Sequence, residues 1–176
     1  MIKLKKCKAC GERFQVFTST QKACSIKCSI ELVKQDKDKA FRKETKRLKE
    51  KIKSRSEWLK DAQTVFNKFV RLRDKNEPCI SCQRHHTGQY HAGHYRSVGS
   101  APELRFEELN NNKQCSVCNN HLSGNLIPYR VNLVKKIGVD KVEWLEGKHE
   151  PKKYTIDQIK EIIKLYKQKI KDLECT

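Results

Sequence analysis

Eight of the nine cysteines in this 176-residue chain fall into four close pairs, and this pairing limits the fold more than any other feature of the sequence. The pairs are Cys7/Cys10, Cys24/Cys28, Cys79/Cys82 and Cys115/Cys118. Four thiolates from two such pairs are typical ligands of tetrahedral zinc, whereas disulfides are rare in cytosolic proteins. The sequence therefore predicts two structural Zn²⁺ sites, and Cys175 is left over.

The first two pairs define a small zinc-finger-like module, predicted over residues 1–30. A Cys-x-x-Cys knuckle is followed directly by Gly11, and 13 residues then separate it from a Cys-x-x-x-Cys pair. A module of this size cannot fold without its metal. We expect Phe14 and Phe17 to supply its miniature apolar core.

Residues 31–55 contain no glycine or proline and few apolar residues, which predicts a basic linker helix exposed to solvent. Two other interpretations stay open. The helix can follow DNA phosphates, or it can pair with a second copy through Phe41 and Leu48. The predicted phosphate contacts in this segment are Lys43, Lys46 and Arg47.

The third region, residues 56–176, contains the helices expected to form the core. Ser56 is the predicted N-cap of its first helix. Apolar residues then recur at helical spacing at Trp58, Leu59, Ala62, Val65, Phe66, Phe69 and Val70. Further on, residues 126–138 and 140–148 predict two short helices, the first ending at Gly138. Thr155 and Gln158 predict a capping box for a last amphipathic helix. The expected class is α+β and mostly helical.

The charge of the chain points to a nucleic-acid partner. The formal net charge is +18, and residues 1–78 hold 23 of the 39 basic side chains. Basic side chains release counterions from phosphates on binding, so a polyanionic partner is favoured. The sequence contains no apolar run that could span a membrane and no signal-peptide core, so we expect a cytoplasmic chain without a membrane partner.

The segment between the last two cysteine pairs contains the candidate chemistry. Its 32 residues fit two short strands and a connecting loop that returns to a helix. A zinc ion with four thiolate ligands has no open position for substrate, so this site is predicted to be structural. The candidate functional side chains lie inside or just beyond the frame: His91, His94, Asn110, Asn119 and His121.

This pattern resembles the zinc-framed HNH (ββα-metal) endonucleases. Asn110 lies five residues before Cys115, and Asn119 directly follows Cys118, as in that family. The stretches `PCISC`, `AGHYRS`, `APELRFEELN` and `KQCSVCNNHLSGNLIPYRV`, with the helix `RSEWLKDAQTVFNKFVRLRD`, are similar to the phage lambda NinG (Rap) recombination protein family. That resemblance covers nearly the whole chain. It implies cutting of branched DNA, including Holliday junctions, inside a bacterial host cell.

The resemblance also implies roles for individual residues. His94 corresponds to the general base, which takes a proton from the attacking water. Asn110 corresponds to the asparagine that ties the loop carrying this histidine. Asn119 corresponds to a ligand of one catalytic divalent ion, Mg²⁺ or Mn²⁺. Arg96 is a further expected DNA contact.

One position departs from the HNH pattern. Many HNH enzymes carry Asp or His directly before the base, whereas this chain has Gly93. The substitute ligands are His91, three residues before the base, and His121. Positions three apart on a regular strand face opposite sides, so a bulge at Gly93 is expected. Ligation by imidazoles without a carboxylate favours Mn²⁺ over Mg²⁺.

Three interpretations of function follow. The first is a structure-selective HNH endonuclease, for which symmetric cutting of a four-way junction requires two active sites and thus a homodimer. The second is an HNH enzyme that nicks ordinary duplex DNA. The third is a non-enzymatic, two-zinc DNA-binding accessory protein in recombination, which the missing ligand before His94 favours.

Overall fold

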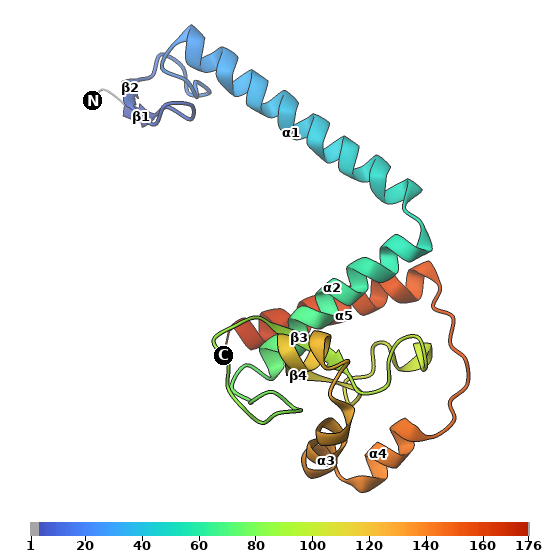
Figure 1. Cartoon of the computed structure of the whole chain (residues 1–176). Helices are drawn as coiled ribbons and strands as arrows, with labels where there is room; N and C mark the ends of the chain where they lie inside the picture. The colour runs from blue at the N-terminus through green and yellow to red at the C-terminus, as the bar shows by residue number, and fades with distance from the viewer. Residues whose placement is uncertain (1–3, 176) are drawn as a thin grey trace. The chain divides into compact units, whose positions relative to one another are not determined.

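The computed structural model describes residues 4–175, and the chain divides into two compact units, Met1–Lys53 and Ser54–Thr176 (Figure 1). Helices dominate, and two separate two-stranded antiparallel sheets supply the β-structure. The prediction of a mixed, mostly helical fold is therefore confirmed. None of the helices in the described part of the chain is long and apolar enough to cross a membrane.

The first unit consists of a hairpin, a cysteine-bearing loop and one long helix. Strands β1 (Leu4–Lys6) and β2 (Arg13–Gln15) pair antiparallel. Its only buried apolar side chains within residues 4–53 are Cys7 and Ala23. Phe14 is partly buried, but Phe17 is 88% exposed, so the predicted aromatic core is wrong for Phe17. Two short strands cannot cover both rings.

Helix α1 (Ile26–Ile52) begins inside the cysteine module, five residues earlier than predicted from the basic segment alone. Ser25 is the reason, because its side chain accepts a hydrogen bond from the backbone N–H of Cys28. Cys28 therefore lies in the first turn of the helix. None of the residues of α1 is buried.

The second unit begins with helix α2 (Arg55–Arg73), which is capped by Ser54 and not by the predicted Ser56. Ser54 accepts from the Glu57 N–H, and the Glu57 carboxylate accepts from the Ser54 N–H at 2.7 Å. This reciprocal pair is a capping box, which requires Glu or Gln three positions after the cap. Ser56 has no such partner in the sequence, because Trp58 and Leu59 follow it.

Helices α2 and α5 (Ile156–Glu174) lie side by side (Figure 1) and form the main core. The predicted capping box of α5 is confirmed, because Thr155 and Gln158 exchange hydrogen bonds. The predicted apolar stripe of α2 is also confirmed. The buried members of this core are Ala62, Phe66, Phe69, Val70, Ala92, Phe106, Tyr154, Ile159, Ile163, Tyr166 and Ile170.

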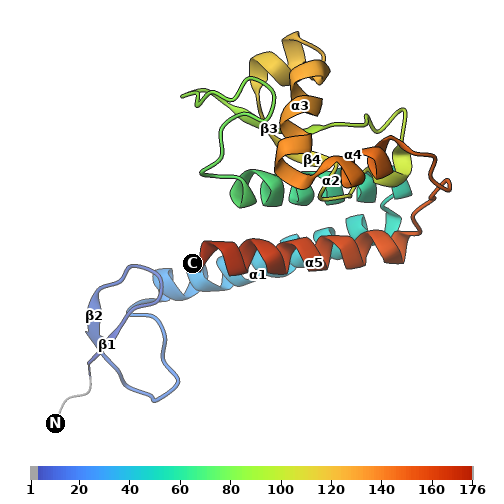
Figure 2. The ribbon, with the colours of Figure 1, turned by 90° about the horizontal axis from the view of Figure 1, so that it is seen from below.

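A second hairpin, formed by β3 (Tyr90–His94) and β4 (Asn111–Cys115), lies between α2 and α3 (Leu126–Ile137) (Figure 2). Between its strands lies a 3₁₀ turn, Pro102–Leu104, and after β4 a π-helical turn, η2 (Val117–His121). Helix α3 ends at Gly138, as predicted, where a φ of 89° suits glycine. Helix α4 (Val139–Glu146) follows and closes a second core around Tyr129, Leu133, Val142 and Leu145.

Candidate functional site

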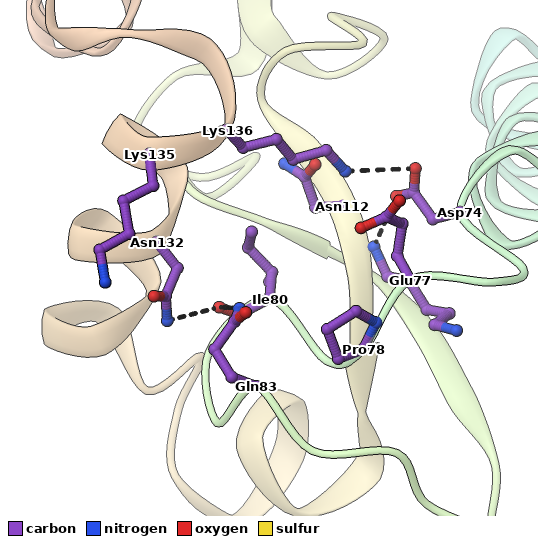
Figure 3. A pocket seen from close by; sticks show the side chains of 10 residues that line it. Asp74, Glu77, Pro78, Ile80, Gln83, Asn112, Asn132, Lys135 and Lys136 are labelled. Atoms are coloured by element: carbon purple, nitrogen blue, oxygen red, sulfur yellow. Dashed lines mark hydrogen bonds and ion pairs between the residues drawn. The ribbon is translucent and has the colours of Figure 1, made fainter.

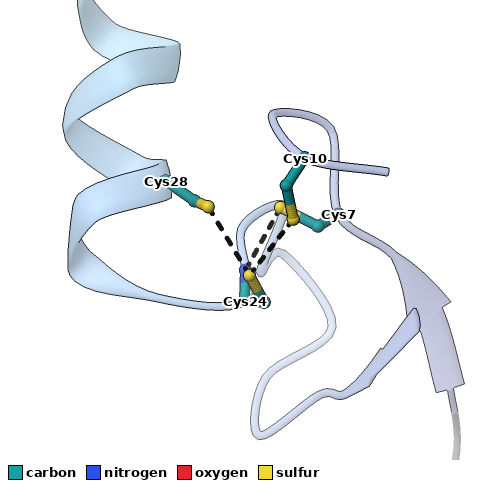
Figure 4. Close-up of side chains that lie close together, drawn as sticks. All are labelled: Cys7, Cys10, Cys24 and Cys28. Carbon is teal, nitrogen blue, oxygen red and sulfur yellow. Dashed lines mark hydrogen bonds between the residues drawn. The ribbon is translucent and has the colours of Figure 1, made fainter. Parts of the chain in front are cut away.

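The four cysteines of the first unit converge on one point (Figure 4). Their sulfur atoms all lie within 4.8 Å of one another, and Cys24 Sγ is 3.6 Å from Cys10 Sγ and 3.5 Å from Cys28 Sγ. Zn–S bonds of about 2.3 Å in a tetrahedron place sulfurs roughly 3.8 Å apart. The cluster can therefore hold a metal ion such as zinc with little rearrangement.

The thiols of this cluster do not ionise equally without a cation. Backbone N–H donors, first that of Cys10, lower the pKa of Cys7 to about 6. By contrast, the neighbouring Cys28 sulfur raises the pKa of Cys24 to about 12. Adjacent negative sulfurs repel one another, so a divalent ion is required to hold all four as thiolates.

The second cluster joins the loop before β3 to the end of β4 and the turn that follows it. Cys79, Cys82, Cys115 and Cys118 also place their sulfurs within 4.8 Å of one another. The N–H of Cys115 donates to Cys79 Sγ at 3.3 Å, and the Asn125 amide donates to Cys118 Sγ at 3.5 Å. This site fixes the loop before β3, the end of β4 and the turn η2 relative to one another.

His86 lies next to the second cluster, although it is not among the predicted site residues. Its Nε2 lies 3.2 Å from Cys82 Sγ, and its backbone N–H donates to the Tyr90 hydroxyl. Burial raises the pKa of Cys82, but the His86 contact and further hydrogen bonds outweigh it and bring that pKa to about 6. The sequence could have indicated this contact, because Cys82 and His86 are only four residues apart.

The β3–β4 ladder is regular, and the bulge expected at Gly93 is absent. Every residue of β3 pairs in order with one of β4, from Tyr90 opposite Cys115 to His94 opposite Asn111. His91 and His94 therefore lie on opposite faces of the hairpin. The expectation that a bulge would bring both imidazoles to one ion is wrong.

His94 is half-buried at the end of β3, and one of its ring nitrogens is fixed. Nε2 lies 3.2 Å from the backbone carbonyl of Arg105, in the loop between the two strands. Because a carbonyl only accepts, Nε2 carries the proton in the neutral ring and Nδ1 holds the lone pair. Burial lowers the pKa of His94, and the Arg105 carbonyl offsets part of this effect.

Asn110 is fully buried and ties the loop that follows His94. Its Oδ1 accepts from the Arg96 N–H at 2.8 Å, and its Nδ2 donates to the carbonyls of Arg96 and Leu104. The Arg96 guanidinium, predicted to contact DNA, donates through Nη1 to the carbonyls of Leu145 and Glu146 at the end of α4. Asn110 thus ties the loop next to His94, which is the kind of contact that the resemblance implied.

Gly93 is required by its neighbour Gln114. A Cβ at position 93 would lie 2.1 Å from Gln114 Oε1, so an Asp or His cannot occupy this position unless Gln114 moves. The Gln114 amide is held by Ser81 Oγ at 2.6 Å and by the Gly124 carbonyl. Its Oε1 is buried without a hydrogen-bond partner, and so is His91 Nε2. His91 and Gln114 are cross-strand partners, so these two atoms belong to the same face.

The other predicted ligands lie on η2. Asn119 is partly buried and donates through Nδ2 to Asn120, which leaves its Oδ1, the atom predicted to bind the ion, outside that bond. His121 is exposed, and residues two apart in a helical turn do not share a side. Within residues 4–175, His, Cys, Asp and Glu ligand atoms gather in threes or more only at the two cysteine clusters. The three histidines His91, His94 and His121 thus form no such group.

A cavity of about 230 Å³ lies beside the frame but does not contain the predicted catalytic residues (Figure 3). Its wall includes Asp74, which is 3% exposed and pairs with Arg73 at 2.8 Å and with Lys136 at 3.3 Å. Asp74 also accepts from the Lys113 N–H. Burial raises the pKa of Asp74, but its Arg73 partner outweighs this and the pKa is lowered. Asp74 is thus an ionised anchor between α2, β4 and α3.

These features define a class of protein with two four-cysteine clusters, the second of which frames a β-hairpin. A sequence-family model described as "Bacteriophage Lambda NinG protein" matches residues 1–175. The chain therefore belongs to the NinG family, and that part of the predicted resemblance is confirmed.

Several curated relatives carry the name Protein ninG. That of Escherichia phage 933W is 40% identical over 187 aligned positions, which cover 96% of this chain and 93% of the relative. That of Escherichia phage lambda is 50% identical over 122 positions, covering 69% of this chain and 60% of the relative. That of Enterobacteria phage H19B is 41% identical over 187 positions. No solved structure matches this chain.

Proposed function

We propose that this NinG-family chain is a metal-dependent endonuclease of the HNH type that cuts branched DNA, including four-way junctions, during phage recombination. The observation that carries the proposal is the state of His94. Its imidazole ends a strand of the cysteine-framed hairpin, one nitrogen is fixed by the Arg105 carbonyl, and Asn110 holds the adjoining loop. A positioned base of this kind is what phosphodiester hydrolysis requires.

His94 would act through Nδ1. Because its pKa is lowered, the ring is neutral at pH 7 and can accept a proton from water. The water oxygen attacks the phosphorus, the bond between phosphorus and the 3′ oxygen breaks, and that oxygen leaves as a hydroxyl after gaining a proton. The products are a 5′-phosphate and a 3′-hydroxyl, as the HNH resemblance implies.

The proposed donor atoms suit a divalent ion, although none of them is a carboxylate oxygen. His91 Nε2 and Gln114 Oε1 are buried without hydrogen-bond partners on the hairpin face opposite His94, and Asn119 offers an amide oxygen from η2. An ion held by these atoms would reach His94 only around the edge of the hairpin. A bound cation would stabilise negative charge on the scissile phosphate and on the leaving oxygen. One imidazole and two amide oxygens favour Mn²⁺ over Mg²⁺, because Mg²⁺ prefers charged oxygen ligands and water.

The DNA would be held chiefly by charge. With a net charge of +18, the chain attracts phosphates irrespective of sequence, and selection of branched DNA then depends on shape. Lys43, Lys46 and Arg47 are exposed on α1 and are the proposed phosphate contacts. Arg96 is a weaker candidate, because two backbone carbonyls already hold its guanidinium.

A second candidate function is a non-enzymatic DNA-binding protein of recombination. The regular register favours it, because His94 lies on the hairpin face that packs against α2 through Ala92. The residues after Cys118 cover the other face, where Tyr129 donates to the Gly93 carbonyl. For nuclease activity, His94 and the metal ligands on the other face would have to meet around the edge of the hairpin.

The test is cleavage by zinc-loaded protein with Mn²⁺ on duplex, flap and four-way substrates of equal length. Wild type should cut the four-way junction fastest, and His94→Ala should lower cleavage at least 10²-fold with unchanged DNA affinity. His85→Ala, at an exposed histidine, is the matched control and should cut normally. Equal cutting of all three substrates would remove the branch preference. Full activity of His94→Ala, or no cleavage by wild type, would leave the DNA-binding function.

A further inference from the structure

Helix α1 carries a row of exposed apolar side chains along one side. Its large apolar side chains with 50–82% exposure are Ile26, Ile30, Val33, Phe41, Leu48 and Ile52. At about 100° per residue, all six fall within an arc of roughly 100° on one side of the helix. We call this set the α1 stripe. An exposed apolar face of this length on a helix that buries none of its own residues indicates a binding surface.

The stripe has a symmetric layout. Ile26 and Ile52 lie 13 positions on either side of Lys39, and Ile30 and Leu48 lie nine positions on either side. If a second α1 helix ran antiparallel to the first and both were centred on Lys39, apolar side chains of one helix would contact apolar side chains of the other at both ends.

We propose that the α1 stripe binds the α1 stripe of a second copy of this chain, with the two helices antiparallel. Two charged residues in the centre of the stripe, Lys37 and Glu44, select this direction. In a parallel pair, Lys37 would face Lys37 and Glu44 would face Glu44. In the antiparallel pair, Lys37 of each copy lies within one turn of Glu44 of the other, so opposite charges meet twice. Polar residues within an apolar helix interface fix register and orientation in this way.

The wider charge of the helix favours the same direction. Residues 26–38 hold three basic and three acidic side chains, whereas residues 39–52 hold seven basic and two acidic ones. A parallel pair would bring the two basic halves together, and an antiparallel pair places each basic half beside a neutral one. Glu44 also pairs with Arg47 of its own helix at 2.7 Å, but that pair is exposed and weak.

Pairing through the stripe leaves the opposite side of α1 accessible. Lys39 and Lys46 lie about 180° from the centre of the stripe on the helical wheel. The same helix can therefore bind a second copy on one side and present basic side chains on the other. This proposal does not depend on catalysis.

The experiment measures the mass of the zinc-loaded full chain by sedimentation equilibrium. Wild type should be a dimer. Ile30→Gln with Leu48→Gln, which keeps the net charge and a good helix former, should raise the dimer dissociation constant more than tenfold. The matched control, Lys39→Gln with Lys46→Gln on the opposite side, should remain dimeric. A monomeric wild type, or a dimer unaffected by the stripe variant, would overturn the proposal.

A charge exchange tests the direction of pairing. Lys37→Glu alone places like charges against Glu44 in an antiparallel dimer and should weaken it, and adding Glu44→Lys should restore it. In a parallel dimer, Lys37→Glu only replaces one like pair with another, so an unchanged dissociation constant would overturn the antiparallel arrangement. Unchanged helix content and zinc content in every variant exclude misfolding, and an exposed exchange of this kind does not disturb a core.

Discussion

The two cysteine clusters have the same ligands in opposite surroundings. In the first unit Cys10 is exposed, and only Cys7 and Ala23 are buried apolar residues among those described. In the second unit Cys79, Cys115 and Cys118 are at most 3% exposed and adjoin the hairpin that carries His94. The first cluster therefore substitutes for a hydrophobic core, whereas the second frames the β3–β4 hairpin beside two existing cores.

Metal removal should separate the two roles most clearly. With a strong chelator, residues 4–25 should lose their hairpin, because structural zinc in small modules contributes about 10–16 kcal/mol of folding free energy. The α2–α5 pair should keep its protected amides, since its core does not include the cysteines. Hydrogen exchange read by mass spectrometry measures both. Simultaneous loss of protection in both units would contradict the comparison.

Two phenylalanines test where apolar burial matters. Phe66 is fully buried between α2 and α5, so Phe66→Ala should lower the free energy of unfolding of the second unit by about 3–5 kcal/mol. Phe17 is 88% exposed in the first unit, so Phe17→Ala is the matched control. It should change the free energy of unfolding by less than about 0.5 kcal/mol. Thermal denaturation of both variants measures this. A large effect at Phe17 would show that the first unit has an aromatic core after all.

The contact between Gly93 and Gln114 is a smaller test of the framed hairpin. Gly93→Ala should cost about 1–3 kcal/mol, because the added Cβ overlaps Gln114 Oε1. Combining it with Gln114→Ala should cost less than the sum of the single changes, since the overlap is then gone. A double-mutant cycle from urea unfolding gives the coupling. Strict additivity would mean that the two residues do not meet.

The smallest expected effect is at the start of α2. Ser54→Ala should cost about 1 kcal/mol through loss of the capping box, whereas Ser56→Ala should stay within about 0.5 kcal/mol. Urea unfolding of the two variants compares them directly. A larger loss of stability for Ser56→Ala than for Ser54→Ala would show that Ser56 is the N-cap.

Local patterns made most of the fold predictable. Cysteine spacing identified both clusters, and helical spacing of apolar residues identified the α2 and α5 stripes. The predicted cap of α2 is two residues too late, because Ser56 lies nearer the first apolar residue, Trp58, whereas only Ser54 can pair with Glu57 in a capping box.

The site was less predictable because it depends on contacts between strands. The ladder is regular at Gly93, and the side chain of Gln114, opposite His91, occupies the space that a side chain at position 93 would need. The sequence alone does not reveal that register. The bond from His94 to the Arg105 carbonyl and the contact of His86 with Cys82 are likewise set by loop geometry.

The proposed nuclease activity requires that the framed hairpin bind a cation beside His94 that the cysteines do not hold. Anomalous scattering from a crystal of the zinc-loaded chain soaked in Mn²⁺ would locate that ion. We expect a manganese peak within bonding distance of Asn119 Oδ1, with a coordinated water within hydrogen-bond reach of His94 Nδ1. Manganese bound only at exposed His121 or on the surface, with nothing beside His94, would contradict it.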